Sequence, residues 1–186
     1  MIEENSKECD IIKLGDIMGF INGSVYLENN YELWKEKFYN EKIKLENIFN
    51  NEEFTIEHVG STAVKGLSAK PIVDIAIGVQ NLDDIKPYIS KLAELYTIKE
   101  NHDSNEILLI DENKKETNFL IHVMLINSIR YKNMIIFRDI LKSNPIILKQ
   151  YENLKIELAM KYSNDRKMYT KSKNDFIQDI LKNTNN

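Results

Sequence analysis

Cysteine is almost absent from this chain, since Cys9 is the only one among 186 residues. With no second cysteine to pair with, the chain forms no intramolecular disulfide and no zinc site built from several thiolates. A chain without internal disulfides fits a reducing compartment, and we therefore expect the protein to be cytoplasmic.

Long hydrophobic runs are missing as well. Apolar stretches such as FLIHVMLI, residues 119–126, are far shorter than the roughly 20 residues needed to cross a bilayer. The first residues, MIEENSKECD, are acidic and polar, whereas a signal peptide begins basic and continues apolar. We therefore expect no contact with a membrane.

Positive charge is not in excess either. Lys and Arg number 25 and Asp and Glu number 29, which gives a net charge of −4 and a pI near 5.5. No basic field exists over the whole chain to gather nucleic acid backbones, so a nucleic acid partner is disfavoured. A small phosphorylated ligand is compatible with this composition, because a local group of lysines can oppose the net charge.

The length corresponds to about one domain with a substantial core. Residues 1–25 contain three glycines and no sustained hydrophobic period, and we interpret them as an N-terminal arm. Residues 26–186 contain no repeat and no interdomain linker, and we interpret them as a single domain.

Hydrophobic periodicity predicts the order of helices and strands. Trp34 lies on the apolar stripe of the first helix, and we expect it in the core. The pattern predicts an α+β fold, in which a mixed sheet has helices on one side and a C-terminal helical layer. The expected helices are 30–49, 81–96 and the chain from 134 onward, with breaks at 144–145 and 163–165; the expected strands are 55–59, 72–79 and a hairpin of 107–110 and 119–126.

The most informative segment, residues 57–79, reads EHVGSTAVKGLSAKPIVDIAIGV and joins two short apolar strands through a turn. Gly60 allows positive φ or a close approach to the backbone. Ser61 and Thr62 can cap a following helix whose free N–H groups favour anions. Asp74 interrupts the second strand, and a carboxylate in an apolar run usually has a metal ion or a cation as its partner. The pairing indicates metal-assisted phosphate chemistry.

The spacing from Gly60-Ser61 to Asp74 is similar to that of the nucleotidyltransferase superfamily. That superfamily carries a second acid two residues after the first, and Ala76 occupies this position here. The superfamily's carboxylates hold two divalent ions that bind a triphosphate and activate the attacking hydroxyl. The resemblance therefore implies a divalent metal cofactor, Mg, Mn or Zn, while Ala76 puts a two-metal site in doubt.

The longer run from His58 to Asp74 resembles the GrpB-like family, small bacterial proteins with a nucleotidyltransferase-like fold. The domain also occurs fused to dephospho-CoA kinase. The family pattern is His-x-Gly-Ser-Thr-x-Val-Pro-Gly-Leu-x-x-Lys-Pro-x-x-Asp, matched here with Lys65 where proline is usual. Residues 137–145 and 165–177 look like the family's C-terminal helical signature. Because most of that family lacks an assigned activity, the resemblance implies a fold more than a reaction.

Asp74 is the candidate metal ligand, and its alternative role is to cap a neighbouring loop. His122 lies in the apolar strand 119–126, where the superfamily's third carboxylate strand is expected; the GrpB-like family commonly has His-x-His here. We predict that Asp74 and His122 are catalytic residues and metal ligands, with His122 as a general base. The alternative for His122 is a hydrogen-bonded core residue. Imidazole favours transition metals over Mg.

Lys and Arg side chains, together with the turn that begins at Gly60, are expected to bind the phosphates of the ligand. Alternatives are a loop-orienting hydrogen bond for His58, surface salt bridges for the Arg and Lys residues, and core packing for Tyr169. Arg166 and Lys173 share a helix face if their helix is continuous. The predicted ligand-binding residues are His58, Gly60, Ser61, Thr62, Lys70, Arg138, Arg166, Tyr169 and Lys173.

Two functions fit these residues. The first is a metal-dependent nucleotidyltransferase that acts on an NTP and an unidentified small acceptor. The second is a catalytically degenerate module of the same fold that binds a nucleotide or another phosphorylated small molecule. Ala76 favours the module, and the retained turn, Asp74 and cations favour a working pocket. Of the two, we favour the enzyme.

Overall fold

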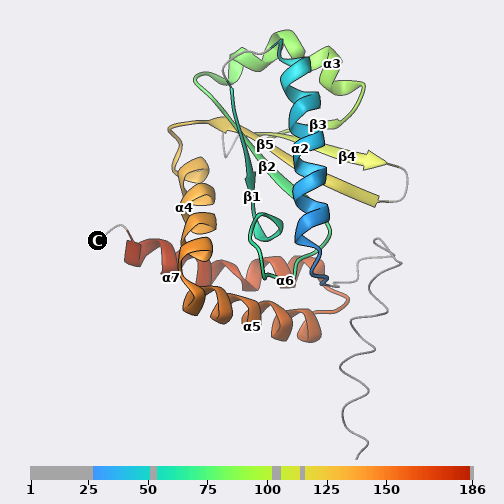
Figure 1. The fold of residues 1–186 in the computed structure, drawn as a ribbon. Coiled ribbons are helices and arrows are strands. Elements are labelled where there is room, and N and C mark those ends of the chain that lie inside the picture. The colour runs from blue at the N-terminus through green and yellow to red at the C-terminus, as the bar shows by residue number, and fades with distance from the viewer. Residues whose placement is uncertain (1–26, 51–53, 102–105, 114–115, 185–186) are drawn as a thin grey trace, which may run out of the picture.

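The computed structural model describes residues 27–50, 54–101, 106–113 and 116–184 (Figure 1). The expected N-terminal arm at 1–25 lies outside these residues, so the division into an arm and one domain stays a prediction. None of the helices in the described part of the chain is both long enough and apolar enough to span a membrane.

A five-stranded mixed sheet forms the centre of the fold. Its strands are β1 (Thr55–Val59), β2 (Val73–Val79), β3 (Thr97–Asn101), β4 (Glu106–Asn113) and β5 (Glu116–Leu125). The strand order is β1-β2-β5-β4-β3; β2 and β5 run parallel, and every other neighbouring pair is antiparallel. β2 is apolar along most of its length because both of its faces are covered.

One face of the sheet is covered by α2 (Tyr31–Ile48), the 3-10 helix η2 (Leu82–Tyr88) and α3 (Ile89–Ala93). Trp34 of α2 is 0% exposed in the core beneath, as its place on the apolar stripe predicts. Alternate residues of β2 and β5 supply the sheet side of this core, as the two-residue period of a strand requires.

The expected helix over 81–96 forms as two shorter helices, η2 and α3. Pro87 has no N–H to donate, and in an α-helix its ring would collide with the carbonyl four residues earlier, so a 3-10 helix precedes the short α3. The sequence pattern also does not reveal β3, because its sequence TIKEN is mostly polar and contains a single large apolar residue, Ile98. β4 and β5 are longer than expected because both continue into the polar run between them.

The opposite face of the sheet is covered by α4 (Ile129–Ser143). Tyr131 of α4 packs there against Ala76 of β2 and Met124 of β5. Helices therefore lie on both faces, and the expectation of helices on one side only is wrong.

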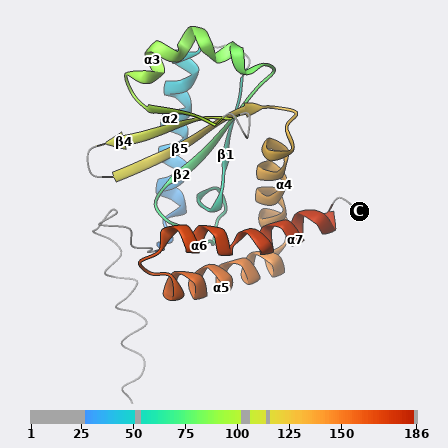
Figure 2. The ribbon, with the colours of Figure 1, turned by 180° about the vertical axis from the view of Figure 1, so that it is seen from behind.

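The C-terminal helical layer consists of α5 (Pro145–Lys161), α6 (Arg166–Ser172) and α7 (Asn174–Thr184). Figures 1 and 2 show these helices side by side at the end of the sheet where β1 finishes. The predicted breaks are confirmed: Asn144 caps α5, and Asp165 caps α6 through a bond from the Met168 N–H. The α+β fold, with a mixed sheet, flanking helices and this layer, is confirmed as well.

Candidate functional site

The turn after β1 touches the carboxylate of β2. Val59 at the end of β1 lies opposite Asp74, and Gly60 follows directly. Gly60 has φ 71° and ψ −172°, a conformation that is very costly for any other residue. A Cβ atom added at Gly60 would lie 2.4 Å from Oδ2 of Asp74. Gly60 thus has the positive φ that the sequence indicated, and it allows the backbone to approach Asp74.

Ser61 and Thr62 do not cap an α-helix, contrary to the expectation. They belong to a three-residue 3-10 helix, Ser61–Ala63, which is too short to attract an anion through its N-terminus. Their side chains are instead fixed by neighbours. Oγ1 of Thr62 lies 3.0 Å from Nε2 of His58, and the buried Tyr151 hydroxyl forms a hydrogen bond with the Ser61 side chain.

His58 supports the turn from the side of α2. Its ring stacks on Phe38, with centroids 4.8 Å apart, while Nε2 contacts Thr62. Burial lowers the pKa of His58 to about 4, although the charge of Asp74 opposes the shift. The ring is absent from the cavity described below, so this geometry matches a loop-orienting hydrogen bond, and a direct role in ligand binding stays a prediction.

The lowered pKa of His58 predicts an acid-sensitive fold. The unfolded chain binds a proton near pH 6.5 and the folded chain only near pH 4, so stability is lost as the pH falls through this window. Between pH 7 and pH 4, the free energy of unfolding of the wild type should fall by on the order of 2 kcal/mol more than that of His58→Gln. Urea titrations across this range measure the difference. Parallel pH profiles for the two proteins would contradict the expectation.

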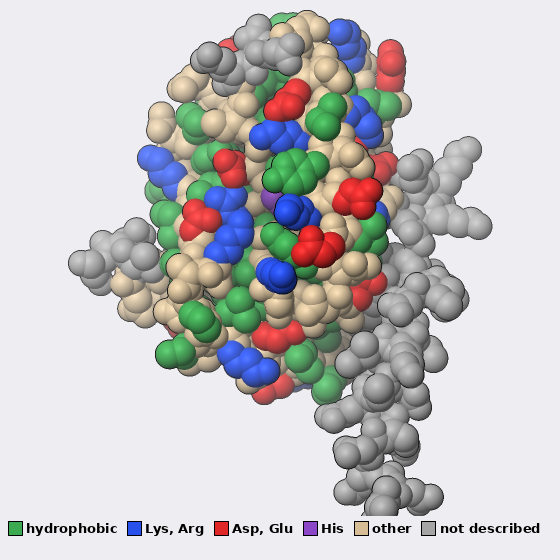
Figure 3. Space-filling view, in the orientation of Figure 1, with side chains coloured by type: hydrophobic (Ala, Val, Ile, Leu, Met, Phe, Trp, Pro, Cys, Tyr) green, Lys and Arg blue, Asp and Glu red, His purple; other side chains and the backbone are tan. Residues whose placement is uncertain are grey.

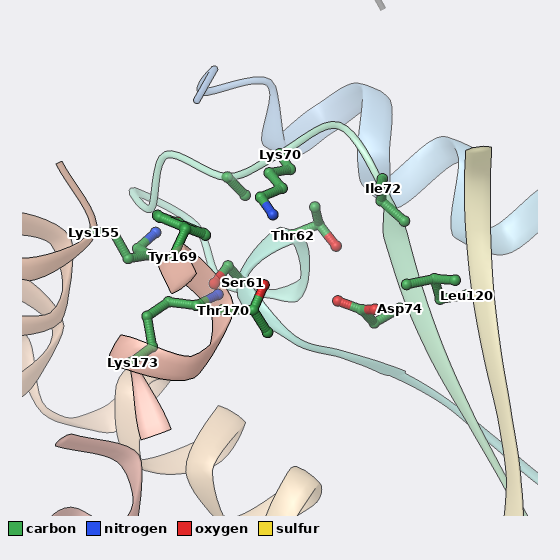
Figure 4. A pocket seen from close by; sticks show the side chains of 11 residues that line it. Ser61, Thr62, Lys70, Ile72, Asp74, Leu120, Lys155, Tyr169, Thr170 and Lys173 are labelled. Atoms are coloured by element: carbon green, nitrogen blue, oxygen red, sulfur yellow. The ribbon is translucent and has the colours of Figure 1, made fainter. Parts of the chain in front are cut away.

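A cavity of about 210 Å³ opens between the turn, β2 and the C-terminal helices (Figure 4). Two of its polar lining residues, Lys155 and Thr170, were not singled out from the sequence. In Figure 4, the Asp74 carboxylate points toward the turn, and the amino groups of Lys70 and Lys173 point into the same space. Six predicted residues meet at this cavity: Ser61, Thr62, Lys70, Asp74, Tyr169 and Lys173.

Tyr169 forms part of the cavity wall and lies against two of its lysines. The side chain is 1% exposed, and the amino groups of Lys70 and Lys173 each lie 4.6 Å from its ring centroid. Cations at this distance from an aromatic face are attracted by the ring. Burial lowers the pKa of Lys173, while the charge of Asp74 opposes the shift. Tyr169 therefore packs in the wall and positions the amino groups that a ligand would meet.

Lys155 is the main cation that sequence reasoning missed. It is 1% exposed, donates to the carbonyl of Ser68, and pairs with Glu152 at 3.1 Å. Both oxygens of Glu152 accept from the N–H of Ser68, so Glu152 and Lys155 together hold the loop that leads to Lys70 in place. Burial lowers the pKa of Lys155 to about 8, against the charge and hydrogen bond of Glu152. In the sequence, Lys155 lies between Tyr151 and Leu158 at the spacing of one helix face. This position on an apolar face is the signal that could have identified Lys155 as a buried cation.

Arg138, one of the two predicted arginines, does not line the cavity. Arg138 donates to Glu57 at 2.6 Å, to the carbonyl of His58 at 3.0 Å and to Asp139 at 2.7 Å, and so ties α4 to β1. Its ligand role stays a prediction. The side chain of Arg166 lies outside the described part of the structure.

The shared helix face of Arg166 and Lys173 was expected only if one continuous helix carried both residues. α6 ends at Ser172, Lys173 is its C-cap, and α7 begins at Asn174. The condition of one continuous helix therefore fails. The break does not remove Lys173 from the site, because its side chain still lines the cavity.

Behind Asp74, a row of charged groups crosses the sheet. Nε2 of His122 lies 3.8 Å from Oδ1 of Asp74, and Nδ1 lies 2.5 Å from Oε1 of Glu106. Glu106 is 5% exposed and was not singled out from the sequence; Arg130 contacts it at 3.3 Å. Burial alone would lower the pKa of His122, but the hydrogen bonds and charges of Asp74 and Glu106 raise it to about 9.

These residues do not fit a two-metal centre. Ala76 is buried where a second acid would be, and its partner in β5 is His122. The imidazole separates Asp74 from Glu106, so the two carboxylates do not converge on one point. Among the residues that the structure describes, no three His, Cys, Asp or Glu side chains are grouped to hold an ion. The predicted catalytic and metal roles of Asp74 and His122 stay predictions.

Comparisons with known proteins agree with the fold and the motif. The family model for GrpB protein matches residues 24–183. The chain is 37% identical over 172 residues to the Glutamate-rich protein GrpB of Alkalihalophilus pseudofirmus, which covers 89% of this chain and 98% of that protein. The crystal structure of conserved protein GrpB from Enterococcus faecalis is similar at a TM-score of 0.73 and 27% identity, covering 81% of this chain and 91% of that one.

A much looser likeness is to a structure of the Cid1 poly(U) polymerase bound to MgATP. Its TM-score is 0.44 at 16% identity, over 69% of this chain and 45% of the polymerase. At that distance the polymerase's activity does not carry over. The family match, by contrast, spans almost the whole of the described sequence, so the chain belongs to the GrpB protein family.

Proposed function

We propose that the cavity binds a small phosphorylated molecule and holds its phosphate with the amino groups of Lys70 and Lys173. The observation that carries this proposal is the convergence of lysines from separate segments on one cavity, where Asp74 is the only carboxylate among the described residues that line it. Lys155 adds a third amino group, although Glu152 neutralises part of its charge. Ammonium groups and hydroxyls such as that of Ser61 are common ligands for phosphate oxygens.

The size of the cavity limits how the ligand binds. Pockets that enclose a whole drug-sized molecule measure roughly 300–1,000 Å³. At about 210 Å³, this cavity holds a phosphate or diphosphate group with a small organic portion. A nucleoside triphosphate would therefore place its phosphates inside and its base outside. A protein that binds NTPs in this way would recognise the phosphates and would discriminate only weakly among the bases.

The charge of the face shown in Figure 3 supports a small ligand over a nucleic acid. On the face shown in Figure 3, basic and acidic side chains are interspersed, with no continuous basic area. A protein that follows a nucleic acid backbone needs a basic track along its surface. The lysines that line the cavity would instead meet a small ligand there.

Metal-dependent transfer of a nucleotidyl group to a small acceptor is the second candidate. The contact between the Gly60 turn and Asp74 favours it, because the same two features occur together in the sequence pattern of nucleotidyltransferases. Ala76 and the position of His122 disfavour it. Against the effect of burial, Asp74 and Glu106 raise the pKa of His122 to about 9. Without a metal ion, the ring is therefore protonated near pH 7 and is a poor acceptor for the proton of an attacking hydroxyl.

Calorimetric titration with phosphate, pyrophosphate and the four NTPs, paired with a pyrophosphate-release assay, separates the two candidates. We expect pyrophosphate and the NTPs to bind with similar affinities, uncharged nucleosides not to bind, and no product to form. Pyrophosphate release with any acceptor would establish the second candidate. A failure of every phosphorylated probe to bind would contradict both.

A further inference from the structure

His122 is enclosed by acceptors on both sides. Nδ1 lies 2.5 Å from Oε1 of Glu106, and Nε2 lies 3.8 Å from Oδ1 of Asp74. A neutral imidazole has a hydrogen on only one nitrogen, whereas the protonated ring presents one to each carboxylate. The outer carboxylate is itself fixed, because Arg130 contacts Glu106 at 3.3 Å. The geometry therefore suits an imidazolium that is hydrogen-bonded to Glu106 and lies at ion-pair distance from Asp74.

This cation lies where the nucleotidyltransferase pattern places further acids. Asp74 pairs with Leu120 and Ala76 with His122, so the imidazole lies one step along the sheet from the carboxylate of the cavity. A second acid at position 76 would face a metal ion shared with Asp74. In this chain the small side chain of Ala76, which is 0% exposed, leaves the space beside Asp74 to the imidazole.

We propose that the imidazolium of His122 replaces a metal ion as the charge partner of Asp74, so that the cavity binds its phosphorylated ligand without a divalent cation. The part of this inference that concerns the ligand rests on the phosphate binding proposed above. The part that concerns the metal ion is independent of it. His122 is absent from the cavity wall and acts through Asp74, which makes it a positioning residue.

The consequence for the ligand is electrostatic. Asp74 is a carboxylate on the wall of a cavity that is proposed to hold an anion. Without a cation beside it, that carboxylate would repel the ligand, because charges separated by a few ångströms in a protein interact strongly. The imidazolium cancels this repulsion and leaves the lysines to attract the phosphate. The affinity for phosphate then comes from the lysines and does not depend on the concentration of a metal ion.

The first test is a titration of the ligand-free wild type with Mn²⁺, followed by electron paramagnetic resonance. We expect no site-bound Mn²⁺ at millimolar concentrations, and we expect His122→Asp to bind Mn²⁺ because a third carboxylate joins Asp74 and Glu106. Mn²⁺ bound by the wild type and lost in Asp74→Asn would overturn the inference. This arm needs no ligand, so it holds whether or not phosphate binding is found.

The second test is calorimetry with pyrophosphate in the presence of a chelator. His122→Asn should weaken binding about tenfold, because Asp74 loses its partner, and Asp74→Asn in the same background should restore the affinity to within about threefold. A merely structural role for His122 would not be rescued by removing the Asp74 charge. An unrescued double variant, or wild-type binding that the chelator abolishes, would overturn the inference. Loss of pyrophosphate binding under every condition would instead contradict the proposed function.

Discussion

Lys173→Ala is expected to weaken pyrophosphate binding by about 10- to 100-fold, the scale of one charge-assisted hydrogen bond. Its amino group lies over the Tyr169 ring and points into the cavity, so the substitution removes a charge that the ligand meets directly. Burial lowers the pKa of Lys173, whereas the negative charge of Asp74 opposes that shift and favours the charged amino group.

The matched control is Lys171→Ala. Lys171 is exposed on the same short helix, two residues earlier, and does not line the cavity. Isothermal titration of both variants measures the contrast, and thermal unfolding checks that each is folded. The control should bind as the wild type does. Equal losses in the two variants would show a general effect of surface charge and would count against a ligand contact by Lys173.

Gly60→Ala is expected to lower the free energy of unfolding by about 3 kcal/mol or more, through backbone strain and a steric clash together. The new Cβ would lie 2.4 Å from Oδ2 of Asp74, which is far inside the normal contact distance. Either the turn or the Asp74 side chain must move, so pyrophosphate binding should be lost at the same time.

Gly66→Ala is the control for this prediction. Gly66 also has a positive φ, 89°, but a Cβ there would meet no atom within 4 Å. Gly66→Ala should therefore lower the free energy of unfolding only by the cost of the backbone conformation, about 1–2 kcal/mol. Chemical denaturation of the two variants compares these costs directly. If Gly60→Ala lowered the free energy of unfolding no more than Gly66→Ala does, the new Cβ would not clash with Asp74 and the prediction would be wrong.

The parts of the site that the sequence predicts are those encoded close together in the chain. Gly60, Ser61 and Asp74 fall within one strand-turn-strand unit, so their spacing is sufficient to bring Gly60 against Asp74 and to place Ser61 and Asp74 on one cavity. The lysine and tyrosine of the C-terminal signature came from the family resemblance. No local pattern indicated that Lys173 ends one helix and precedes another.

The parts that the sequence does not predict depend on contacts between distant segments. Glu152 and Lys155 grip the backbone of Ser68 across more than 80 residues, and a helical sequence alone gives no sign of such a partner. Glu106 reaches His122 only because β4 and β5 pair in one particular register. A charged residue at a core-facing position is the general signal for such contacts, and Lys155 shows it.

A crystal structure of the protein with pyrophosphate tests the central claim most directly. The account predicts that the phosphate groups lie in the cavity between the Gly60 turn and α6, within hydrogen-bond distance of the amino groups of Lys70 and Lys173. It also predicts that no metal ion lies between Asp74 and the ligand. Pyrophosphate seated elsewhere on the protein, or bound in the cavity through a metal ion on Asp74, would contradict it.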